Sequence, residues 1–157
     1  MRIAFDPGMT TGVAWREPSE TFDITTYGDG PTTQTFLGDL RATQWPGESI
    51  VVVLDGFHKG YGITEVIIED FTSRPGPAVN LSAPRTIGRI EAWCDERGID
   101  PIMQYPSAAK GVVTNDRLRA MGGWKRGEAH SRDALRHLLY REDKLGIINL
   151  SEIPKGQ

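Results

Sequence analysis

The sequence has almost no cysteine and no long apolar segment, and both absences restrict the kinds of protein it can encode. Cys94 is the only cysteine in 157 residues, which excludes an internal disulfide and is typical of a reducing compartment. No apolar run has the length of a membrane span or of a signal-peptide core, and Asp6 interrupts the first one. We therefore expect a cytoplasmic protein without membrane contact.

The chain also lacks the overall positive charge that is common in nucleic-acid-binding proteins. Its formal net charge is −3 and its pI is about 5.6. The charge is unevenly distributed, because residues 110–141 contain eight Lys or Arg against three Asp or Glu. Composition thus argues mildly against nucleic-acid binding, but it leaves a basic C-terminal third.

The length and the apolar patterns predict one domain over residues 1–157, with residues 143–157 as a C-terminal tail. Strands are expected at 2–6, 11–16, 20–28, 64–71 and 101–105, and helices at 82–98 and 128–141. Residues 29–44 have no clear pattern. Residues 48–59 have strong β propensity, but their apolar spacing favours a helix. The order predicts an α/β fold with a mixed five-stranded sheet, in which three antiparallel strands precede α-β-α-β-α and helices cover both faces.

Two carboxylates lie at the ends of predicted strands. Asp6 ends the first strand and precedes Pro7-Gly8, which is also an ordinary turn signal. Glu69 lies in the apolar run Val66–Phe71, where a carboxylate is costly unless something binds it, although solvent or an arginine at the sheet end can do so. Both residues are candidate metal ligands.

His130 and Asp133 are three residues apart in a predicted helix, so they project from one face. Such a pair is also common in a first helical turn, where an aspartate suits the helix dipole. Carboxylates from two strands and a helix repel one another unless a cation lies between them. The joint pattern therefore predicts a site for a hard divalent metal. By contrast, His58 and His137 have no acidic partner at ligand spacing and are expected at the surface, and Cys94 is expected in the core or an interface.

The sequence resembles the RuvC-like Holliday junction resolvases of the RNase H-like superfamily, in particular a phage-type member. The similarity covers nearly the whole chain. It rests on Phe5-Asp6-Pro7-Gly8 with Thr11-Gly12, Val66–Glu69, Ile87–Ala92, Tyr105-Pro106 with Lys110, and His130–Ala134. Two departures from the family are the proline-rich loop 74–77 and the acidic net charge.

This resemblance implies an RNase H-like fold and an endonuclease that resolves Holliday junctions by paired nicks in a bacterial or phage-infected cell, with other branched DNA as a further candidate substrate. It implies two Mg²⁺ or Mn²⁺ ions held by Asp6, Glu69, Asp133 and His130, with His130 either binding metal or positioning water. Lys110 would neutralise the scissile phosphate. The other expected DNA contacts are Arg74, Arg117, Arg119, Lys125, Arg126 and Arg132.

Resolution of a four-way junction requires two symmetric cuts, so a homodimer is expected. The helix at 83–97 is the candidate interface, through Ile87, Gly88, Glu91 and Trp93. Three alternatives remain open at this stage: a nuclease acting on RNA, flaps or bubbles as in the YqgF group, an ATP-binding protein of the actin type, and a binding-only relative. The actin type needs two large lobes, for which the chain is too short.

Overall fold

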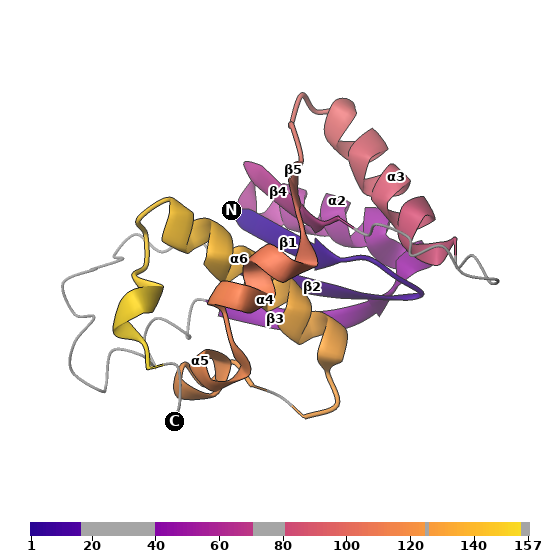
Figure 1. The fold of residues 1–157 in the computed structure, drawn as a ribbon. Coiled ribbons are helices and arrows are strands. Elements are labelled where there is room, and N and C mark those ends of the chain that lie inside the picture. Colours follow the sequence, from indigo (N-terminus) through magenta and orange to yellow (C-terminus); the bar gives the residue numbers. More distant parts are fainter. Residues whose placement is uncertain (17–39, 71–80, 125, 155–157) are drawn as a thin grey trace.

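A computed structural model describes residues 1–16, 40–70, 81–124 and 126–154. Its centre is one five-stranded sheet with the order β3-β2-β1-β4-β5 (Figure 1). The strands are β1 (Arg2–Asp6), β2 (Thr10–Arg16), β3 (Leu40–Pro46), β4 (Glu65–Glu69) and β5 (Ile102–Gln104). β1, β2 and β3 pair antiparallel, whereas β4 pairs parallel with β1 and β5 parallel with β4.

Helices cover both faces of this sheet (Figure 1). One face carries α2 (Ile50–Tyr61) and α3 (Ser82–Asp95), and the other carries α6 (Ala129–Lys144). The remaining helical segments are α4 (Pro106–Val112), α5 (Asn115–Ala120) and the 3-10 turns η2 (Gly47–Ser49) and η3 (Leu150–Glu152). Among the described residues, no helix combines the length and the apolar character needed to cross a membrane. The α/β fold with a mixed five-stranded sheet is confirmed.

Alternation along the strands places the carboxylates under α6. Successive side chains of a strand point to opposite faces, so Asp6 shares the face of Ala4 and Glu69 shares the face of Ile67. Ala4 and Ile67 belong to the core cluster formed with α6, whereas Phe5 belongs to the cluster formed with α2 and α3. Both carboxylates therefore lie at the strand ends, on the side of the sheet where α6 packs.

Close packing of α6 on β2 depends on Gly12. A Cβ atom at this position would lie 1.9 Å from the carbonyl oxygen of His130. Gly12 also pairs with Asp6 in the β1–β2 register. The missing side chain therefore lets the first turn of α6 approach β2 beside Asp6.

Ion pairs fix the C-terminal half of α6 on the same sheet. Glu142 is fully buried and accepts two hydrogen bonds of 2.5 Å from the guanidinium of Arg16 in β2. The preceding residue, Arg141, binds Glu65 of β4 at 2.6 Å. A buried carboxylate needs such a partner, so these pairs specify how α6 lies across the sheet.

The helix predicted at 48–59 is confirmed as α2, with the left-handed Gly62 as its C-cap. The strand expected at 20–28 lies outside the described residues. In the part of the chain that the structure describes, the third strand is instead β3, most of which falls in a stretch with no clear sequence pattern. The basic segment before the last helix contains two helices, α4 and α5, which were not predicted; α4 starts with Pro106 at its first position, where proline is favoured.

Candidate metal centre

Three carboxylates from separate elements meet at one end of the sheet. Asp6 ends β1, Glu69 ends β4 and Asp133 lies in the second turn of α6. One oxygen of each lies within 4.8 Å of the others. The predicted cluster of Asp6, Glu69 and Asp133 is thus present in the structure, and its all-oxygen composition suits a hard divalent cation.

Burial makes this cluster electrostatically costly without a cation. Asp6 is 9% exposed and Glu69 is 6% exposed. Burial, together with the negative charges of Glu69 and Asp133, raises the pKa of Asp6 to about 6, although His130 opposes the shift. A divalent ion between the oxygens would remove this penalty, so the residues present fit a metal site.

The raised pKa gives the metal-free protein a testable pH dependence. Because the folded state holds the proton of Asp6 more tightly than the unfolded state, stability should fall as pH rises from about 4 to about 6. Asp6→Asn removes this titration. We therefore expect the free energy of unfolding of the wild type to decrease relative to that of Asp6→Asn across this range, measured by urea denaturation in EDTA. If the difference in free energy of unfolding between the two proteins stays constant with pH, the raised pKa of Asp6 is contradicted.

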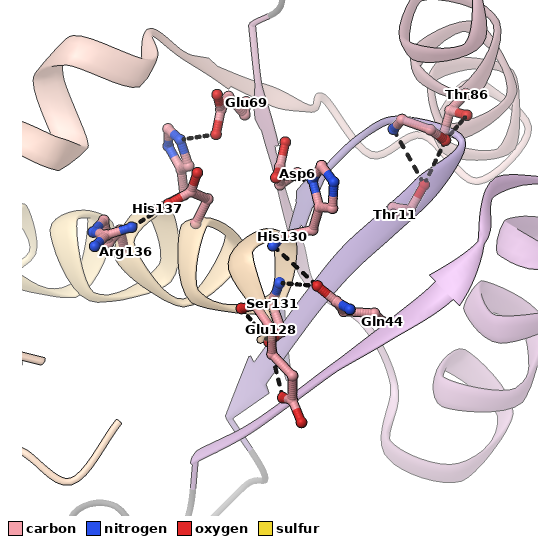
Figure 2. A network of polar contacts seen from close by, with 12 residues as sticks. Asp6, Thr11, Gln44, Glu69, Thr86, Glu128, His130, Ser131, Arg136 and His137 are labelled. Atoms are coloured by element: carbon pink, nitrogen blue, oxygen red, sulfur yellow. Dashed lines mark hydrogen bonds and ion pairs between the residues drawn. The ribbon is translucent and has the colours of Figure 1, made fainter. Parts of the chain in front are cut away.

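His130 is held beside Asp6 by two contacts. Its Nδ1 lies 2.7 Å from Oδ2 of Asp6 (Figure 2). Its backbone N–H donates to Oε1 of Gln44 in β3 at 3.0 Å, and Ser131 donates to the same oxygen. The Gln44 side chain therefore satisfies free N–H groups at the start of α6 and fixes the position of His130. Sequence reasoning did not identify Gln44, because it lies in the unassigned stretch.

Asp133 is flanked by two cationic side chains. Nζ of Lys110, from α4, lies 2.9 Å from Oδ2, and the guanidinium of Arg136 pairs with Oδ1. Burial alone would lower the pKa of Lys110, but the hydrogen bond to Asp133 and the charges of the three carboxylates raise it. Lys110 therefore carries a positive charge at the edge of the cluster.

The prediction that His137 lies at the surface is wrong. The residue is 0% exposed, and its Nε2 lies 2.9 Å from Oε2 of Glu69 (Figure 2). Its Nδ1 lies 2.8 Å from Oε1 of Gln104. Its partner Glu69 is remote in sequence, which hid the contact. The helical spacing did contain a signal, since His130, Asp133 and His137 are three and four residues apart and share one face of α6. His58 is partly buried and packs edge-on against Trp93.

The predicted DNA contacts divide into three groups. The prediction that Arg117 contacts DNA is wrong. The residue is 5% exposed and its guanidinium donates to the carbonyls of Val112 and Ile153, so it supports the fold. Arg119 and Arg132 each lie 4.3 Å from the ring centroid of Trp124, and Arg126 is exposed. Arg74 and Lys125 lie outside the described residues.

A cavity of about 450 Å³ opens beside Asp133. Its charged lining residues are Lys110, Arg132 and Arg136 against one carboxylate, Asp133, and Trp124 forms part of its wall. The surplus of positive charge suits a phosphate group, and the cavity shares Lys110 and Asp133 with the metal centre.

The predicted dimer surface on α3 needs one correction. Trp93 is 3% exposed, and its Nε1 donates to Asp55 at 2.7 Å within the same chain. Gly88 and Glu91 are exposed, and Ile87 is partly buried. Cys94 is buried, as expected, and burial raises the pKa of its thiol to about 11.

No protein-family model matches the sequence, and no curated protein matches it. Solved structures similar to the chain include two of RuvC from Thermus thermophilus. The complex of RuvC with a Holliday junction substrate has a TM-score of 0.60 at 15% identity, over 93% of this chain and 96% of that chain. A second RuvC structure has a TM-score of 0.54 with the same identity and coverage. The chain therefore has the RNase H-like fold of RuvC.

Proposed function

We propose that the protein is a divalent-metal-dependent endonuclease that cuts branched DNA and resolves four-way junctions by paired nicks. The observation that carries this proposal is the convergence of Asp6, Glu69 and Asp133 within 4.8 Å, beside a charged lysine. The similarity to a RuvC structure with bound Holliday junction supports the choice of substrate.

The chain's own residues have distinct roles in this reaction. Asp6, Glu69 and Asp133 would hold two Mg²⁺ or Mn²⁺ ions, which supply Lewis acidity toward a water molecule and toward charge on the leaving oxygen. Lys110 places a positive charge next to Asp133, where it can neutralise the scissile phosphate. His130 either binds metal or holds the attacking water, because its ring lies against Asp6.

Three arginines, of which Arg119 and Arg126 are exposed and Arg132 is partly buried, would hold the DNA backbone on either side of the cut. Arg119 in α5 and Arg126 precede α6, whereas Arg132 lies in the first turn of α6 and lines the cavity. Contacts of this kind position the substrate without reading its sequence. Binding should therefore depend on the shape of the DNA and weaken strongly with salt.

The metal preference of the enzyme tests whether His130 binds a metal ion. An imidazole beside oxygen ligands favours a borderline metal over a purely hard one. We expect Mn²⁺ to support at least as much cleavage as Mg²⁺, and Ca²⁺ to support DNA binding without turnover. Rates measured for the wild type and His130→Ala with each metal would check this. A strong preference for Mg²⁺ together with an active His130→Ala enzyme would show that His130 does not bind metal.

The proposed substrate requires two active sites, because one active site cannot cut two opposed strands together. We expect a homodimer through α3, with paired nicks at symmetric positions of a four-way junction. Gly88 is the best position to test, because it is exposed and a Cβ atom there meets no atom within 4 Å. Gly88→Leu should thus fold normally but weaken the dimer.

The dimer prediction is measured by analytical ultracentrifugation and by nicking assays on two substrates. Gly88→Leu should lose junction resolution more than nicking of a simple flap, because each metal centre stays intact. Gly88→Ala is the matched control and should behave as the wild type. A monomeric wild type that still makes symmetric paired cuts would contradict the proposal.

A panel of labelled substrates tests the activity itself. Four-way junctions, flaps, bubbles and RNA–DNA hybrids should be compared with linear duplex, with and without metal. We expect four-way junctions to be cut fastest. If flaps, bubbles or RNA are cut efficiently while four-way junctions stay intact, the result would instead favour the alternative nuclease that acts on RNA, flaps or bubbles.

A further inference from the structure

The structure assigns His137 a positioning role: its buried imidazole fixes Glu69 so that this carboxylate meets a metal ion in one orientation. The inference rests on the proposed metal centre and adds to it a residue with no part in the roles above. The assignment comes from the hydrogen-bonded chain Glu69–His137–Gln104, which joins β4, α6 and β5 next to the carboxylate cluster. Figure 2 shows the contact between His137 and Glu69.

His137 is completely enclosed and its ring has two partners. Nε2 lies 2.9 Å from Oε2 of Glu69, and Nδ1 lies 2.8 Å from the side-chain amide of Gln104. An imidazole without water needs partners for both nitrogens, because an unsatisfied buried polar group is costly. The ring is therefore fixed in rotation as well as in position.

The chemistry of the two partners determines the direction of the hydrogen bond to Glu69. An ionised carboxylate can only accept, so Nε2 must carry the hydrogen and donate it to Oε2. Gln104 can offer Nδ1 either its amide oxygen or its amide nitrogen. The hydrogen bond to Glu69 is consequently the same whichever way the Gln104 amide is turned.

This hydrogen bond divides the two oxygens of Glu69 between different tasks. Oε2 is engaged by a ring that cannot rotate, which leaves Oε1 for a cation shared with Asp6 and Asp133. Carboxylates that bind metals are themselves held by hydrogen bonds, and loss of such a partner typically lowers metal affinity about 10–100-fold. His137 thus contributes to metal binding without contact with the metal.

His137→Leu and His137→Gln form a matched pair for the test. Leucine fills the space without a donor, whereas the amide nitrogen of glutamine can replace the Nε2 donor. We expect His137→Leu to weaken Mn²⁺ binding about 10–100-fold, measured by isothermal titration calorimetry without DNA. His137→Gln should recover most of the affinity. Equal affinity in His137→Leu and the wild type, or an equal loss in both variants, would overturn the inference.

Two controls separate positioning from stability. Leu138→Val changes the neighbouring fully buried residue of α6, which belongs to the core cluster and not to the polar chain. It should lower the melting temperature but leave Mn²⁺ affinity unchanged; a comparable loss of affinity would indicate that His137→Leu acts only through destabilisation. Asp6→Asn tests the metal centre itself: if the wild type binds no Mn²⁺, or Asp6→Asn binds it normally, the proposed site fails whatever His137 does.

Nuclear magnetic resonance of the wild type tests the assignment without any substitution at His137, should His137→Leu not fold. Long-range ¹H–¹⁵N spectra should show a hydrogen on Nε2 of His137, and titration with Mg²⁺ should shift that nitrogen. Gln104→Leu should loosen the ring and lower Mg²⁺ affinity in the same experiment. An Nε2 without hydrogen, or a resonance unaffected by saturating Mg²⁺, would contradict the positioning role.

Discussion

Asp6→Asn is expected to abolish cleavage while junction binding survives or becomes tighter. The substitution removes a metal ligand and one negative charge that faces the DNA phosphates, and it leaves the basic residues in place. A metal ion stabilises a transition state by several kcal/mol, and each 1.4 kcal/mol is a factor of ten in rate. The rate should therefore fall by about 1,000-fold or more.

Single-turnover cleavage and gel-shift titrations of the same junction measure both effects. The environment of Asp6 makes the substitution conservative for the fold, because burial already favours its uncharged form. Glu65→Gln is a suitable control, since this acid lies on the same strand as Glu69 but pairs with Arg2 and Arg141 away from the cluster. Near-normal nicking by Asp6→Asn with Mg²⁺ would place the metal site elsewhere.

Among glycine-to-alanine substitutions in the part of the chain that the structure describes, Gly12→Ala is expected to destabilise the fold most. The new Cβ would meet the carbonyl carbon and oxygen of His130 at 2.1 and 1.9 Å, and backbone at the start of a packed helix cannot move aside cheaply. Overpacking of a core typically costs about 1–3 kcal/mol, and we expect the upper end of this range. The first turn of α6 should shift, and His130 should move away from Asp6.

Urea denaturation measures the stability loss, and calorimetry with Mn²⁺ measures the effect on the site. Gly88→Ala supplies the matched control, because its Cβ meets open space in the middle of α3. Alanine is favoured over glycine there, so this variant should gain about 0.5–1 kcal/mol. A Gly12→Ala protein as stable as the wild type would refute the close contact between β2 and α6.

The sequence predicted those residues of the site that can be recognised from their residue type and their position in a strand or helix. Asp6 and Glu69 each follow an apolar strand, and Asp133 shares a helical face with His130, so local patterns were sufficient. The RNase H-like fold then brings three distant elements together. The distance of 4.8 Å itself comes from sheet order and from α6 packing on Gly12, which no local pattern contains.

The residues that sequence reasoning missed or misplaced depend on partners far away in the chain. His137 binds Glu69 across 68 residues, and Gln44 reaches His130 across 86. Arg117 was expected on DNA because it is basic, but burial under the C-terminal segment turns its guanidinium toward backbone carbonyls. Trp93 likewise resembles an interface residue in sequence, although Asp55 on α2 accepts its N–H within one chain.

Cleavage of a synthetic four-way junction, with and without divalent metal, tests the central claim most directly. Purified protein should be incubated with a junction labelled on each strand in turn, in Mg²⁺, in Mn²⁺ and in EDTA. The account predicts paired nicks at symmetric positions with either metal and no cleavage in EDTA. A junction that remains intact with both metals, or is cut equally in EDTA, would contradict it.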